Sequence, residues 1–143
     1  MLGYYVVEPE VAGGWGEGTE FTRIIGQPVI VHKLHYQFDG WLGDALLEST
    51  PCYIVTMRLA DKIKQARLSG VGFEKVEISK SEQFNDLHPN HDLPEFTWLQ
   101  IWGEPGVDDF GVTSDFQLVV SEKALGVLKD IGISHALVEP LAR

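Results

Sequence analysis

Two histidines and an aspartate in one short segment have the residue types and spacing that best fit metal chemistry. His88 and His91 flank a Pro-Asn dipeptide, and Asp92 follows directly. Imidazole nitrogens and carboxylate oxygens are common ligands of zinc, so the segment could serve a metal-dependent enzyme or a metal-binding domain. The single cysteine, Cys52, and the other histidines lie at no spacing that completes a four-ligand site. We keep this metal loop as an alternative and expect no cofactor.

No other pattern indicates catalysis. His32 and His35 are three residues apart on an expected strand, and this odd spacing points them to opposite faces. The glycine-rich segment 13–18 reads as a surface loop: it lacks the lysine of a phosphate-binding loop, and Glu17 and Glu20 would repel phosphate. A Gly-x-Ser-x-Gly motif is absent, and nothing distinguishes a catalytic carboxylate pair. The sequence therefore predicts a protein that is not an enzyme.

The charge distribution points to a protein partner. The chain has 11 basic and 21 acidic residues, a net charge of −10. Residues 81–115 hold eight of the acids and five aromatic residues, with no Lys or Arg. Nucleic acids and anionic membranes are disfavoured, because phosphates are bound by basic clusters, whereas acids mixed with exposed aromatics are typical of protein-binding surfaces. The expected contact residues are Trp41, Asp44, Glu48, Trp98, Trp102, Glu104, Asp108 and Asp109.

The length and composition predict one domain spanning residues 1–143, large enough to bury a core without disulfides or metal. A single cysteine excludes an internal disulfide. No apolar run approaches the roughly 18–20 residues of a membrane span. Residues 1–10 have no basic region and carry Glu8 and Glu10, which a signal peptide would not. These features predict a cytoplasmic protein.

A repeated pattern positions the expected elements. A strand over residues 52–55 leads to Thr56 as helix N-cap, a helix that Gly70 ends, and a strand over residues 73–78. The same order recurs as a strand over residues 116–120, N-cap Ser121, a helix ended by Gly132 and a strand over residues 136–138. The second helix is expected to be one turn shorter. Divergent duplication or common α/β patterning would explain the recurrence.

Further apolar runs predict strands over residues 4–7, 29–38 and 97–102, and a short helix over residues 41–47. The expected fold class is α+β, a single domain with a mixed sheet of about six or seven short strands and two main helices.

Several segments resemble a bacterial family of small uncharacterised proteins over nearly the whole chain. They are residues 4–5, 11–14, 33–44, 79–84 and 108–111. The segment Leu-Val-Val-Ser-Glu-Lys-Ala-Leu at residues 118–125 resembles the C-terminal strand and helix of immunity proteins from polymorphic toxin systems. That resemblance implies a cytoplasmic protein that binds and neutralises one bacterial toxin, and it supplies no catalytic residues.

The leading hypothesis is therefore a non-enzymatic immunity protein whose partner is a basic protein toxin. Aromatic side chains would anchor the contact, and carboxylates would mimic the anionic substrate of the toxin. Besides the metal loop, the alternative is a carbohydrate-binding module that uses the four tryptophans, Trp15, Trp41, Trp98 and Trp102, as stacking platforms. The oligomeric state stays open.

Overall fold

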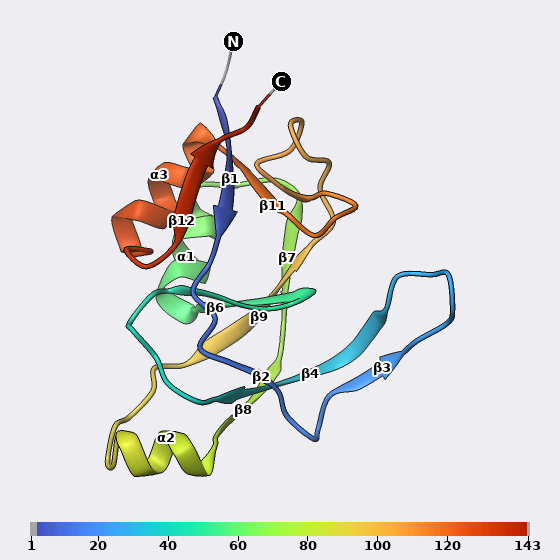
Figure 1. Cartoon of the computed structure of the whole chain (residues 1–143). Helices are drawn as coiled ribbons and strands as arrows, with labels where there is room; N and C mark the ends of the chain where they lie inside the picture. Colours follow the sequence, from blue (N-terminus) through green and yellow to red (C-terminus); the bar gives the residue numbers. More distant parts are fainter. Residues whose placement is uncertain (1–2, 143) are drawn as a thin grey trace.

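Residues 3–142, the part of the chain that the computed structural model describes, form three helices and twelve strands in three four-stranded sheets (Figure 1). In chain order the elements are β1 (Tyr4–Glu8), β2 (Gly13–Trp15), β3 (Glu20–Thr22), β4 (Ile30–Phe38), β5 (Leu46–Ser49), β6 (Cys52–Thr56), α1 (Met57–Gln65), β7 (Val71–Glu74), β8 (Val76–Lys80), α2 (Glu82–Leu87), β9 (Phe96–Ile101), β10 (Phe110–Val112), β11 (Leu118–Ser121), α3 (Glu122–Ile131) and β12 (Leu137–Pro140). The α+β class is confirmed. The expectations of one mixed sheet and of six or seven strands are corrected, whereas the two expected main helices are α1 and α3, and α2 is a further, shorter helix.

Two of the sheets share one topology. The first has the order β10-β11-β1-β12, and the second has the order β5-β6-β9-β7. In each, a hairpin (β10–β11 or β5–β6) leads into a helix, and the helix leads to a return strand. One strand from elsewhere in the chain, β1 or β9, lies antiparallel between the hairpin and the return strand. The repeated pattern in the sequence thus corresponds to two units of the same connectivity.

Both helices of these units begin at the predicted N-caps. The hydroxyl of Thr56 accepts a 3.2 Å hydrogen bond from the N–H of Leu59, and that of Ser121 accepts one of 3.0 Å from Ala124. Helix α3 ends at Gly132 as predicted, but α1 ends at Gln65, well before Gly70. The second helix has ten residues and the first has nine, so the expectation of a shorter second helix is wrong.

The third sheet has the order β2-β4-β3, and β8 pairs in parallel with β4. The hairpin of β3 and β4, drawn in blue and light blue at the right of Figure 1, projects away from the rest of the fold. The expected loop over residues 13–18 begins as β2, where Gly13 lies against β4 so closely that a Cβ would come within 1.8 Å of the carbonyl oxygen of Gln37.

Two further expectations are corrected. The helix over residues 41–47 does not form, because the carboxylate of Glu10 binds the N–H groups of Leu42 and Asp44 and Gly43 takes a φ of +106°. The strand over residues 73–78 is two strands, β7 and β8, which belong to different sheets.

Strand β6 lies between two hydrophobic cores, and all five of its residues are buried. Tyr53 and Val55 face the core that contains α1 and α3, whereas Cys52 and Ile54 face the core built on β4. The alternation of strand side chains between two faces explains why this strand is apolar throughout. Within residues 3–142, no helix has the length and apolar character needed to cross a membrane.

Candidate functional site

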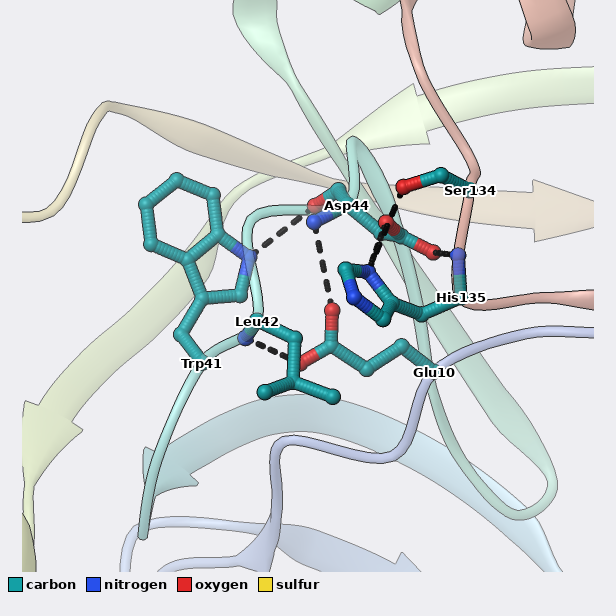
Figure 2. A network of polar contacts seen from close by, with 6 residues as sticks. All are labelled: Glu10, Trp41, Leu42, Asp44, Ser134 and His135. Carbon is teal, nitrogen blue, oxygen red and sulfur yellow. Dashed lines mark hydrogen bonds and ion pairs between the residues drawn. The ribbon is translucent and has the colours of Figure 1, made fainter.

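Two buried carboxylates and one histidine converge from three distant parts of the chain (Figure 2). Glu10 follows β1, Asp44 precedes β5, and His135 lies between α3 and β12. The exposed fractions of Glu10 and Asp44 are 7% and 2%, and one ligand atom of each of the three residues lies within 4.8 Å of the others. We refer to these three residues as the carboxylate–histidine cluster.

Hydrogen bonds fix both carboxylates of this cluster. Oε2 of Glu10 accepts a bond of 2.7 Å from the N–H of Leu42, and Oε1 accepts one of 3.2 Å from the N–H of Asp44. Oδ2 of Asp44 accepts a bond of 2.9 Å from the N–H of His135. Oδ1 of Asp44 lies 2.9 Å from Nδ1 of the same histidine. The arrangement places two carboxylates and an imidazole where they can bind a cation.

Sequence reasoning missed most of this cluster. Asp44 was expected as a surface contact, and its burial corrects that role. Glu10 and His135 were not singled out, since 91 positions separate Asp44 from His135 and no local spacing joins them. A buried carboxylate that stabilises a turn by accepting backbone hydrogen bonds leaves no motif in the sequence.

The metal loop is not assembled as a site. His88 and His91 are exposed, their ring centroids lie 5.9 Å apart, and both rings pack against Phe84. The amine of Lys80 donates a hydrogen bond to the carbonyl of His91. Among residues 3–142, three metal-ligating side chains come together at the carboxylate–histidine cluster and not at His88, His91 and Asp92.

Three of the expected contact residues are withdrawn from the surface to different extents. Trp98 is 7% exposed and belongs to the core built on β4, because its position on β9 points it inward. Trp41 is half-buried, and its indole N–H donates a 3.0 Å bond to the carbonyl of Asp44. Glu48 is also half-buried; burial raises the pKa of its carboxyl group, against an opposing hydrogen bond from Thr50.

The loop over residues 102–109, between β9 and β10, carries the remaining expected contacts. Trp102 is 67% exposed, as is Val107, and Glu104 is exposed. Asp108 is half-buried, and its carboxylate accepts a 2.8 Å hydrogen bond from the N–H of Glu104. Asp109 is half-buried and bound to two serines. This loop therefore joins an exposed tryptophan to an exposed acid.

The four tryptophans do not form a common stacking platform. Trp98 is buried, Trp41 is half-buried, and the ring of Trp15 packs 5.1 Å from that of Phe21. Trp102 alone among the four is exposed. A carbohydrate site that used all four side chains is thus inconsistent with their placement.

Few of the acids have a basic partner. In the part of the chain that the structure describes, ion pairs join Lys33 to Glu77 at 3.6 Å, His35 to Glu77 at 3.8 Å and His135 to Asp44. The two histidine pairs require a protonated ring. Among residues 3–142, therefore, most of the 21 acidic side chains form no ion pair with a basic side chain.

No protein-family model matches the chain, and comparison with curated proteins finds no match. Neither comparison links the chain to immunity proteins.

Proposed function

We propose that the protein is a non-enzymatic binding protein that acts in the cytoplasm, an immunity protein that neutralises a basic bacterial toxin. The observation that carries this proposal is the exposure of Trp102, 67% of whose surface is open to solvent. Tryptophan is enriched among the residues that dominate binding energy at protein interfaces. Glu104 and Val107 on the same loop supply an acid and a second apolar contact beside it.

The backbone holds the indole of Trp102 in place before any partner binds. Trp102 lies over Gly72 on β7, where a Cβ would come within 2.4 Å of the indole ring. The backbone N–H of Trp102 also donates a 2.8 Å hydrogen bond to the carbonyl of Gly70. An anchor that is already ordered loses less conformational entropy on association, and this favours tight binding.

The excess of acidic over basic residues supports the proposal that the partner is a basic protein. A net charge of −10 attracts a cationic protein over long range and raises its rate of association. The same charge disfavours a nucleic acid or an anionic membrane as partner. Association driven in this way should weaken as salt shortens the screening length to about 8–10 Å.

The test compares capture of a partner from a bacterial lysate by the wild type, by Trp102→Ala and by the control Leu137→Ala. Leu137 is 65% exposed on β12, at the opposite edge of its sheet from β10, the strand that the 102–109 loop enters. We expect wild type and Leu137→Ala to retain one basic protein. Trp102→Ala should bind it about thirtyfold more weakly, which corresponds to about 2 kcal/mol.

Co-expression supplies the functional half of the test. The captured protein should arrest growth of a bacterial host when it is expressed alone, and the wild-type chain should restore growth. Gly72→Ala, which displaces the indole without removing it, should rescue less well than the wild type. The proposal is contradicted if the captured protein is harmless, or if Trp102→Ala and Leu137→Ala bind it equally well.

A further inference from the structure

The geometry points to a second site, independent of the binding surface: we propose that Glu10, Asp44 and His135 bind one divalent transition-metal ion. The three side chains come from separate segments and offer two carboxylate oxygens and one imidazole nitrogen within 4.8 Å of one another (Figure 2). Carboxylates are preferred by Mn²⁺, and imidazole with carboxylate is a common donor set for Zn²⁺.

The negative charge of the two buried carboxylates favours binding of a cation. Glu10 and Asp44 are more than nine-tenths buried, and burying two carboxylates beside each other is unfavourable unless an opposite charge or a proton compensates. Within residues 3–142 neither carboxylate pairs with a Lys or Arg, and the one basic side chain that forms an ion pair in the cluster is His135, with Asp44. A divalent ion would neutralise both carboxylates together.

The separation between two of the ligand atoms is close to that of adjacent ligands of one ion. Nδ1 of His135 and Oδ1 of Asp44 lie 2.9 Å apart. Two ligands that each lie about 2.0–2.1 Å from a zinc ion and subtend the tetrahedral angle are separated by about 3.3 Å. A zinc ion would replace the direct contact between these two atoms, which would move apart by about half an ångström.

The backbone orients the carboxylates in the way that surrounding hydrogen bonds orient metal ligands. The N–H groups of Leu42 and Asp44 bind the two oxygens of Glu10, and the N–H of His135 binds Oδ2 of Asp44. Each carboxylate oxygen has two lone pairs, so one remains for an ion. Such partners commonly contribute tenfold or more to metal affinity.

An ion can reach the cluster from solvent. The side chain of His135 is 43% exposed, and Glu10 also lines an open groove of about 460 Å³ beside Trp41 and Leu42. Three protein ligands leave positions for water, which is the coordination found where a metal acts on a small molecule rather than serving structure alone.

The experiment titrates the full chain, first stripped with EDTA, with ZnCl₂ and separately with MnCl₂ in a calorimeter. We expect one Zn²⁺ per chain and weaker binding of Mn²⁺, in the usual order of divalent affinities. Glu10→Gln and His135→Gln should each weaken Zn²⁺ binding by about tenfold or more. The control His88→Gln/His91→Gln removes the two exposed histidines of the metal loop and should leave the affinity unchanged.

Thermal unfolding keeps the test decisive if a variant folds poorly. Saturating Zn²⁺ should raise the midpoint of the wild type and of the control, because a ligand that binds only the folded state stabilises it. It should raise the midpoint of His135→Gln, whose altered side chain is partly exposed, much less. The proposal would be overturned if the wild type did not bind Zn²⁺, or if the control variant lost as much Zn²⁺ affinity as the cluster variants. The cluster would then serve only to hold the three segments together.

Discussion

The hydroxyl of Ser121 donates a 2.7 Å hydrogen bond to Oδ1 of Asp109 while it accepts the N–H of Ala124 at the start of α3. The other oxygen of Asp109 accepts a 2.8 Å bond from the N–H of Ser69. One carboxylate therefore ties the loop before β10 to the first turn of α3 and to the segment after α1. Asp109 was expected to contact a partner, and the structure gives its carboxylate these internal bonds instead.

Stability should depend on the ionisation of Asp109. Burial raises the pKa of its carboxyl group, but hydrogen bonds from Ser121 and Ser69 outweigh burial and lower the pKa below the ordinary 3.8. The ionised form thus stabilises the fold above pH 3.8, and this contribution disappears as the pH falls through the lowered value. In urea unfolding, the difference in free energy between wild type and Asp109→Asn should be largest near neutral pH and shrink below pH 3.8.

The matched control for this titration is Asp86→Asn, an exposed acid on α2. Because Asp86 is exposed, this substitution should change the free energy of unfolding by no more than about 0.5 kcal/mol. A difference for Asp109→Asn that does not change between neutral pH and about pH 3 would contradict the argument.

The two helix caps should differ in their contribution to stability. Thr56→Ala removes one capping bond and should lower the free energy of unfolding by about 1 kcal/mol. Ser121→Ala removes a cap of the same kind and also the bond to Asp109, so we expect a loss of about 2 kcal/mol. Denaturant titration of both variants, with exposed Ser114→Ala as control, measures the difference. Equal losses would show that the Asp109 bond adds nothing.

The two cores should unfold together, because β6 and β9 contribute side chains to both. Phe38→Ala in one core should cost about 3–5 kcal/mol, and Leu128→Ala in the other about 2–5 kcal/mol. Both variants should keep a single transition in which far-ultraviolet circular dichroism and tryptophan fluorescence change at the same denaturant concentration. Separate transitions in either variant would mean that the cores fold independently.

The projecting β3–β4 hairpin should be dispensable for stability. Ile24 and Ile25 at its tip are 49% and 101% exposed, and Phe21 and Ile30 beside them are also exposed. Ile24→Ser with Ile25→Ser should change the free energy of unfolding by no more than about 0.5 kcal/mol. Light scattering should show less self-association, since the variant removes apolar surface. A loss of more than about 1 kcal/mol would show that the tip packs against the fold.

The features that the sequence predicted correctly depend on interactions between residues that are close together in the chain. The N-caps at Thr56 and Ser121 and the helix stop at Gly132 follow from short-range hydrogen bonding and glycine conformation, and all three are confirmed. The strands over residues 4–7 and 52–55 agree with β1 and β6 because apolar β-branched runs between turn residues favour extended chain.

Long-range contacts account for what the sequence could not predict. Residues 41–47 have helical spacing, but the carboxylate of Glu10 binds their backbone N–H groups from more than thirty positions away. Trp98 and the exposed Trp102 are both tryptophans. Trp98 is buried because its strand, β9, lies between the two hydrophobic cores. The carboxylate–histidine cluster escapes prediction for the same reason.

The topology also constrains the order in which the chain can fold during synthesis. Both strands that pair with β1, β11 and β12, lie more than a hundred residues later: Tyr4 pairs with Ser121, and Tyr5 with Pro140. Strand β1 is therefore synthesised long before its partners, and both of its edges stay unpaired until most of the chain has been made. The β5–β6–α1–β7 unit and β9 are complete before then, so all strands of one of the two equivalent sheets are available to pair while the other sheet still lacks three of its four.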